Sequence, residues 1–259
     1  MSAPEQPQRS QPSLAGGFAA AVAFFTRIPA ESPGFGETPL VDAAWAFPLV
    51  GAGIGAIIAL VFLVGGLLRL GDWPSALLAV LAGLLLTGAL HEDGLADTAD
   101  GLFGGGDRSR RLAIMRDSRH GTFAVLALIL SIGLRAAALA QIGEAVSAGL
   151  ALVAAHAVSR ALLPVTMWAL PSARDDGLGA DAGRPHSARI IAGLGIALAI
   201  AATALGPLRA AIAVVIAAIT VVMAAVAALR RVGGYTGDVL GAFQQVAEVT
   251  ILLAACAAR

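Results

Sequence analysis

Long apolar runs separated by short polar segments form the main pattern along this chain of 259 residues. A helix needs about 20 apolar residues to cross the hydrocarbon core of a bilayer. The runs that reach or approach this length are 43–70, 75–90, 123–142, 145–170, 190–205, 208–229 and 239–258. The pattern therefore predicts an all-α, polytopic membrane bundle with about six to seven transmembrane helices.

The N-terminal part of the chain does not fit this pattern. Residues 1–13 are rich in Gln, Pro and Ser, which predicts a disordered tail that we expect to be cytoplasmic, and residues 14–259 are expected to form a single helical transmembrane catalytic domain. Residues 14–28 are apolar but short, and they lack the small-residue cleavage site of a secretory signal peptide. We expect an interfacial or partly inserted helix there, with a membrane span as the lesser alternative.

The composition agrees with a membrane protein. Hydrophobic residues make up 58% of the chain and charged residues only 13%, compared with about 25% charged in typical soluble domains. All of the basic residues are arginine, and the formal net charge is zero, so no surface for nucleic acid is indicated. Cys256 is the only cysteine, which excludes a disulfide within the chain.

The stretch 91–122, HEDGLADTADGLFGGGDRSRRLAIMRDSRHGT, is the polar exception in this apolar chain. Asp93, Asp97 and Asp100 have the spacing i, i+4, i+7, which places their carboxylates on one helical face within roughly 60° of arc. Three such charges repel one another unless a cation lies among them, so the spacing predicts a Mg²⁺ site. Glu92 is a further candidate ligand, and His91 points elsewhere on the helix as a candidate substrate group.

The surroundings of these aspartates indicate a functional site at one end of the membrane bundle. The aspartates follow the apolar run 76–90 with no recognised breaker, so we expect them to extend a membrane helix, where carboxylates by default mark function. Residues 104–106 should end that helix, and Asp107 should cap the next one, at 108–115. Arginines beside metal-binding aspartates suit a phosphate or diphosphate. A solvated loop between two spans is the alternative.

Charged residues also occur inside the predicted spans, where an isolated charge is costly. Arg160 lies one turn after His156 on the same helical face and requires an anionic partner, for which substrate phosphate and Glu248 are the candidates. Arg135 can reach the bilayer surface or pair with Glu248.

The distribution of arginines indicates the orientation of the bundle. Arg27, the loop 171–189, Arg230 and Arg231 should lie on the same side as the central polar stretch. Because positive charge is retained in the cytoplasm, we expect this face to be cytoplasmic and the protein to lie in a bacterial inner membrane. The turns near Trp73, Glu144 and Gly206 should lie on the other side, and those near Gly105, Ala180 and Gly233 on the cytoplasmic side.

Four short sequence motifs resemble those of the cobalamin-5′-phosphate synthase family, also called adenosylcobinamide-GDP ribazoletransferases. They are HEDGLADTADG at 91–101, MRDSRHGT at 115–122, FFTRIP at 24–29, and GGYTGD at 233–238 with Gly241 and Ala242. The resemblance implies Mg²⁺-dependent joining of adenosylcobinamide-GDP to α-ribazole or its 5′-phosphate, with release of GMP. The expected partners are these small molecules and the lipid bilayer, with no nucleic acid, and a homo-oligomer is left open.

Together, the resemblance and the charge pattern assign roles to individual residues. The candidate catalytic residues are Asp97, Asp100 and Asp117. The candidate metal ligands are Asp93, Asp97, Asp100 and Glu92. The candidate substrate-binding residues are Arg27, His91, Arg116, Arg119, Arg160 and Asp238.

Two other classes of membrane protein are alternatives. Asp97-x-x-Asp100-Gly101 looks like the opening of the motif of CDP-alcohol phosphotransferases, which act on lipids, but the remainder of that motif is absent. A cation or metabolite transporter should show an inverted repeat and charged residues that continue to the far side, and the sequence shows neither.

Overall fold

The computed structural model describes residues 13–30, 39–177 and 183–257. The regular elements of these residues are all helical, and a single isolated bridge joins Ser172 to Tyr235. The elements are α1 (Leu14–Phe25), the 3₁₀ helix η2 (Leu40–Ala46), α2 (Phe47–Leu67), α3 (Asp72–Thr87), α4 (Leu90–Phe103), α5 (Arg108–Ile114), α6 (Thr122–Ile142), α7 (Ala145–Ala169), α9 (Ser187–Leu205), α10 (Pro207–Val232) and α11 (Gly237–Ala257). The predicted all-α fold is confirmed.

Six helical segments of the described chain are long and apolar enough to cross a membrane. They are Leu40–Leu67, which joins η2 and α2, together with α6, α7, α9, α10 and α11. The bent pair α3 and α4 is a seventh candidate if it counts as one broken span. These numbers agree with the six to seven spans predicted from the apolar runs.

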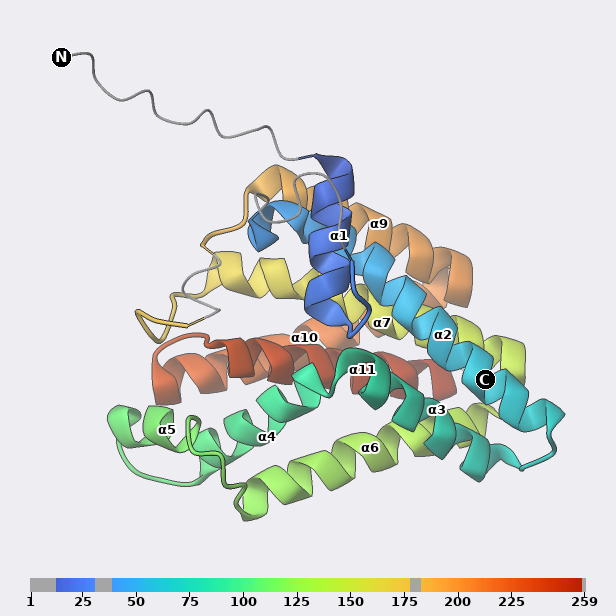
Figure 1. The fold of residues 1–259 in the computed structure, drawn as a ribbon, viewed down its shortest axis with the longest axis horizontal. Coiled ribbons are helices and arrows are strands. Elements are labelled where there is room, and N and C mark those ends of the chain that lie inside the picture. The colour runs from blue at the N-terminus through green and yellow to red at the C-terminus, as the bar shows by residue number, and fades with distance from the viewer. Residues whose placement is uncertain (1–12, 31–38, 178–182, 258–259) are drawn as a thin grey trace.

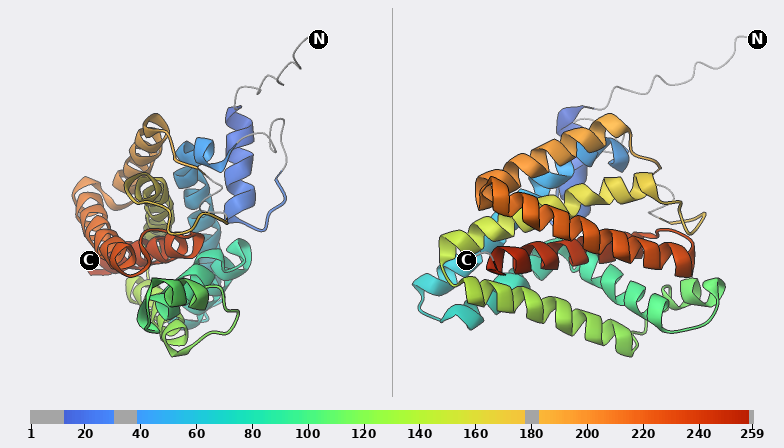
Figure 2. Two further views of the ribbon diagram at one scale, coloured as in Figure 1. Left: turned by 90° about the vertical axis from the view of Figure 1, so that its left-hand side faces the viewer. Right: turned by 180° about the vertical axis from the view of Figure 1, so that it is seen from behind.

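The connections between helices gather at the two ends of the bundle (Figure 1). The turns α2–α3, α6–α7 and α9–α10 lie at the right-hand end, whereas α5 and the α7–α9 and α10–α11 connections lie at the left-hand end. This partition matches the one predicted from the arginines, although Ala180 lies outside the described residues. Seen from behind, α10 runs along α11 (Figure 2).

The N-terminal helix differs from the others in length and direction. It has 12 residues, begins at the N-cap Ser13, and packs on η2 and α2. Figure 1 shows α1 running across the direction of α6, α7, α10 and α11. The helix is too short to span alone, so its expected interfacial or partly inserted position remains a prediction.

The expectation that the aspartates extend the preceding apolar helix is wrong. The chain breaks at Gly88 and Ala89, and α4 is bent by 92° relative to α3. Gly88 has a φ of 65° and ends α3 in the left-handed conformation, which glycine adopts without the penalty of a Cβ atom. A Cβ atom at this position would also collide with the Arg27 guanidinium. The break turns the aspartates of α4 toward the left-hand end of the bundle.

Helix α7 lies at the centre of the bundle, in contact with α2, α9 and α11. It approaches α2 closely because Gly51 and Gly55 face its backbone. A Cβ atom on Gly55 would lie 2.6 Å from the Leu152 carbonyl oxygen, whereas one on Gly53 would meet nothing within 4 Å. Gly51 and Gly55 thus allow the close approach of α2 and α7.

We expect Gly55→Leu to destabilise the protein by about 1–3 kcal/mol, because the new side chain has no room between α2 and α7. Thermal unfolding in detergent, followed by circular dichroism, measures the effect. Gly53→Leu is the matched control, since its side chain would enter open space on the same helix. Equal melting temperatures for the two variants would contradict the proposed packing.

Candidate active site

The candidate site begins where α4 crosses the first turns of α11. The two helices approach closely at Gly94 and Gly241: a Cβ atom on Gly94 would lie 2.7 Å from the Asp238 carbonyl oxygen, and one on Gly241 would lie 3.2 Å from the Gly94 Cα. The crossing brings Asp93 and Asp97 of α4 beside Asp238, which is far from them in sequence.

Three carboxylates share this region. Asp97 is repelled by Asp93 and Asp238, and Asp238 is also repelled by Asp93. Asp93 is exposed, whereas Asp97 and Asp238 are partly buried. His120 Nδ1 lies 3.9 Å from Asp97 Oδ1, so this histidine also borders the group. The arrangement attracts a cation, because each charge raises the cost of ionising the others.

Of the three aspartates on the predicted helical face, Asp93 and Asp97 are available at the site, whereas Asp100 is not. Asp100 is buried, and its carboxylate accepts hydrogen bonds from the backbone N–H groups of Gly121 and Ala124, the latter at 3.0 Å. Asp100 thereby caps the N-terminus of α6, where the helix dipole favours a negative charge. Because both oxygens are engaged, the geometry favours Asp93 and Asp97 over Asp100 as metal ligands.

The acidic group formed by Asp93, Asp97 and Asp238 fits Mg²⁺, although it does not supply a complete set of metal ligands. Among the residues that the structure describes, no three His, Cys, Asp or Glu side chains are grouped so as to hold a metal ion on their own. Mg²⁺ usually takes one or two carboxylates and completes its shell with water and substrate phosphates. Asp93 and Asp97, with Asp238 beside them, supply this smaller set.

Arg174 connects the acidic group to the loop after α7. Its Nη1 atom lies 3.4 Å from Asp238 Oδ2, and its Nη2 atom donates to the Leu112 carbonyl oxygen at 3.0 Å. The Nε atom is buried without a hydrogen-bond partner in the described part of the chain. Neither Arg174 nor His120 was among the predicted site residues. In the sequence they were marked only by position: Arg174 lies in the polar loop 171–189, and His120 lies in the motif 115–122.

The segment between α5 and α6 carries three of the predicted residues. Arg116 pairs with Asp176 and also attracts Asp238, which places it at the site. Asp117 instead pairs with its neighbour Arg119 at 2.6 Å. Hydrogen bonds from the Arg119 side chain, and then from its backbone N–H, lower the pKa of Asp117 to about 2. A carboxylate with so low a pKa is a weak general base at neutral pH, so the predicted catalytic role of Asp117 gains no support.

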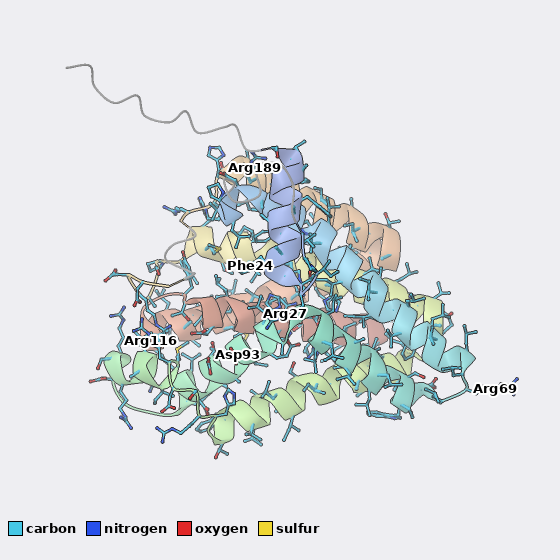
Figure 3. The ribbon with its side chains drawn as sticks, viewed as in Figure 1. Phe24, Arg27, Arg69, Asp93, Arg116 and Arg189 are labelled. Atoms are coloured by element: carbon cyan, nitrogen blue, oxygen red, sulfur yellow. The ribbon has the colours of Figure 1, made fainter. Side chains whose placement is uncertain are left out.

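Arg27 lies at the break between α3 and α4. Its backbone N–H donates to the Leu86 carbonyl oxygen at 2.8 Å, and its guanidinium packs over Gly88. Figure 3 shows Arg27 near the middle of the bundle, with Asp93 below it to the left and Arg116 farther toward the left-hand end. The exposed guanidinium is thus available to an anion near the α4 aspartates.

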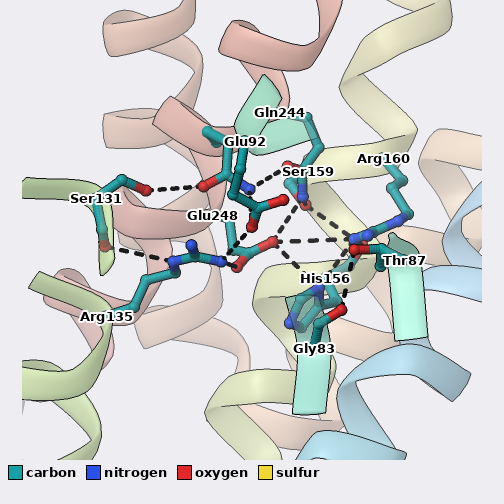
Figure 4. A network of polar contacts seen from close by, with 11 residues as sticks. Gly83, Thr87, Glu92, Ser131, Arg135, His156, Ser159, Arg160, Gln244 and Glu248 are labelled. Atoms are coloured by element: carbon teal, nitrogen blue, oxygen red, sulfur yellow. Dashed lines mark hydrogen bonds and ion pairs between the residues drawn. The ribbon is translucent and has the colours of Figure 1, made fainter. Parts of the chain in front are cut away.

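The remaining predicted residues lie in a buried polar network (Figure 4). Arg135 Nη1 lies 2.9 Å from Glu92 Oε1 and 3.1 Å from Glu248 Oε1, so of the two predicted alternatives for Arg135 the pairing with Glu248 is confirmed. Arg160 Nη1 lies 2.9 Å from His156 Nδ1 and 4.0 Å from Glu248 Oε2, so Glu248 is its nearby protein anion, and its role in binding substrate stays a prediction.

The network gives Glu92 protein partners, and its assignment as a metal ligand stays a prediction. Its Oε1 atom accepts hydrogen bonds from Arg135 and Gln245, whereas Asp93, one residue later, faces the acidic group. Successive residues on a helix point about 100° apart, which separates the two carboxylates. His91 is also buried and stacks on Phe25 at 5.7 Å, away from solvent.

The fold and the site together define a polytopic membrane protein with a cation-attracting acidic group, flanked by arginines, at one end of the bundle. The family model for cobalamin-5-phosphate synthase matches residues 17–256, and the chain therefore belongs to that family. This membership decides against the lipid phosphotransferase and transporter alternatives.

Individual relatives agree with the family. An adenosylcobinamide-GDP ribazoletransferase from Bradyrhizobium diazoefficiens is 45% identical over 238 residues, covering 92% of each chain. The protein of the same name from Mesorhizobium japonicum is 43% identical over 91% of this chain and 90% of the relative. The one from Brucella anthropi is 41% identical over 93% and 96%. No solved structure matches the chain.

Proposed function

We propose that this protein transfers the adenosylcobinamide-phosphate group from adenosylcobinamide-GDP to α-ribazole or α-ribazole 5′-phosphate. The family match over residues 17–256 and the names of the relatives support this activity. The observation that supports its location is the meeting of Asp93, Asp97 and Asp238 beside Arg174, because carboxylates and guanidiniums in this arrangement suit a diphosphate.

The transfer is a substitution at phosphorus. A ribose hydroxyl oxygen of α-ribazole attacks the phosphorus on the cobinamide side, and the bond from that phosphorus to the bridging oxygen breaks as GMP leaves. A carboxylate of the acidic group accepts the hydroxyl proton, and Asp238 is our choice because it is partly buried near Asp93 and is not one of the two residues proposed to hold the metal. The products are adenosylcobalamin, or its 5′-phosphate, and GMP.

Asp93 and Asp97 would hold Mg²⁺ with the diphosphate of the substrate, and Asp238 lies beside them. Bound there, the ion would neutralise charge on the diphosphate and on the departing GMP. Arg174 and Arg116 lie near Asp238 in the same region and would bind phosphate oxygens. Arg27 would hold the substrate at the α3–α4 break.

The activity is tested with purified protein in detergent, given adenosylcobinamide-GDP, α-ribazole and Mg²⁺. We expect GMP to appear in equal amount to the new cobalamin, and we expect EDTA to stop the reaction. Absence of GMP from folded protein with both substrates and Mg²⁺ present would contradict the proposed function.

We further propose that the end of the bundle with the acidic group faces the cytoplasm. In a Cys256→Ala background, Trp73→Cys should react in intact cells with a thiol reagent that does not cross the membrane, whereas Gly105→Cys should react only after lysis. Glu144→Cys and Gly206→Cys should behave like the first variant, and Gly233→Cys like the second. Labelling of Gly105→Cys in intact cells would reverse the orientation.

A further inference from the structure

A second concave site lies beside the acidic group, at the end of α7. It is a cavity of about 590 Å³ whose lining includes Trp168, Leu170, Arg174, Asp175, Arg184 and Tyr235. The volume falls in the range of roughly 300–1,000 Å³ that is usual for small-molecule sites. Arg174 belongs both to this lining and to the acidic group, since it pairs with Asp238.

The walls of this cavity are held together by contacts between distant segments. The Tyr235 backbone N–H donates to the Pro171 carbonyl oxygen at 3.0 Å, and the Ala173 N–H donates to the Tyr235 carbonyl oxygen at 2.7 Å. The Arg184 Nη2 atom donates to the Trp168 carbonyl oxygen at 2.7 Å, and its guanidinium lies 5.5 Å from the Trp168 ring centroid. The cavity is thus formed before any ligand binds.

The chemistry of the lining suits a nucleotide. Trp168 is exposed and offers aromatic surface on which a flat base can stack. Arg174 and Arg184 offer guanidinium groups for phosphate oxygens. Asp175 is exposed at the cavity and has no ion pair or hydrogen bond among the described residues. Its carboxylate can only accept hydrogen bonds when ionised.

We propose that this cavity binds the guanosine part of adenosylcobinamide-GDP, with Asp175 recognising the guanine base. The inference rests on the proposed function for the identity of the nucleotide. In this arrangement Arg174 binds the diphosphate where it passes from the cavity to Asp93 and Asp97. GMP, the leaving group, therefore departs through the cavity.

Asp175 distinguishes guanine from the other base in the reaction. Guanine presents two adjacent donors, N1–H and the N2 amino group, which match the two oxygens of a carboxylate. The benzimidazole base of α-ribazole carries no N–H group once it is joined to ribose. If a base without an N–H donor occupied the cavity, the Asp175 carboxylate would lose its hydration without gaining a hydrogen bond. The cavity therefore favours guanine.

Nucleotide binding tests the inference without turnover. Calorimetry on the full chain in lipid nanodiscs should show GMP binding at least about tenfold more tightly than IMP, which lacks the N2 amino group. Asp175→Asn should weaken GMP binding and make the affinities for GMP and IMP nearly equal. Trp168→Leu should weaken both nucleotides while keeping their ratio. Asp72→Asn, at the other end of the bundle, is the matched control and should bind both nucleotides as the unchanged protein does.

The outcomes separate this inference from the proposed function. An unchanged preference for GMP over IMP in Asp175→Asn would overturn the guanine site, even if the transfer reaction proceeds. A rise in KM for α-ribazole in that variant, with GMP binding unaffected, would also overturn it and assign the cavity to the other substrate. Asp175-dependent preference for GMP in a protein that catalyses no transfer would support the guanine site and contradict the proposed function.

Discussion

Asp93→Asn and Asp97→Asn are each expected to lower the rate of GMP release by several orders of magnitude. Both changes keep the size and polarity of the side chain but remove a charge from the group formed with Asp238. Metal stabilisation of developing charge contributes several kcal/mol to catalysis, and each tenfold in rate corresponds to about 1.4 kcal/mol. The rate at saturating substrates, measured with correctly inserted protein, gives the effect.

The metal concentration separates the possible roles of these residues. Loss of a ligand should be partly recovered by higher Mg²⁺ or by Mn²⁺, whereas loss of a proton acceptor should not. Asp100→Asn should instead lower stability, because Asp100 caps α6 through Gly121 and Ala124. Full activity in both Asp93→Asn and Asp97→Asn at low Mg²⁺ would exclude the acidic group as the catalytic site.

Arg135→Ala should cost about 3–5 kcal/mol of stability, because it leaves Glu92 and Glu248 buried without their cation. Arg135 is only 6% exposed, and solvent cannot replace the lost contacts. Denaturant or thermal unfolding in detergent measures the difference. Since Glu92 lies in the first turn of the helix that carries Asp93 and Asp97, residual folded protein should also have a reduced rate.

Two further variants test the explanation for Arg135. Arg209→Ala removes an exposed arginine from the first turn of α10 and should leave stability unchanged. Arg135→Ala combined with Glu92→Gln should recover part of the loss, because one of the two stranded charges is also removed while Glu248 keeps its contact with Arg160. If Arg135→Ala unfolds like Arg209→Ala, the buried ion pairs do not stabilise the bundle.

The long helices could be predicted from the sequence because their signal is local. An apolar run of sufficient length specifies a span wherever it packs. The cap at Asp107 is similarly local: its side chain accepts from the Arg110 backbone N–H, three residues away, and α5 begins where expected. For the same reason the acidic face was visible as a spacing within one helix.

The break at Gly88 and Ala89 could not be predicted, since glycine is also tolerated inside apolar helices, as Gly53 of α2 shows. What marks Gly88 is the Arg27 guanidinium from a distant segment, which only the fold brings to it. Contacts between distant segments of the bundle could not be predicted from the sequence either. The pairing of Arg174 with Asp238 depends on how the segment after α7 packs beside the start of α11, and the capping of α6 by Asp100 depends on how α4 packs on α6.

Manganese binding tests most directly the claim that the aspartates of α4 hold the catalytic metal. Electron paramagnetic resonance of Mn²⁺ can count bound ions in the purified protein with adenosylcobinamide-GDP present and α-ribazole absent. We predict one bound ion in the unchanged protein, competed by Mg²⁺, and a large loss of binding in the Asp93→Asn, Asp97→Asn double variant. Equal Mn²⁺ binding by the two folded proteins would contradict the account.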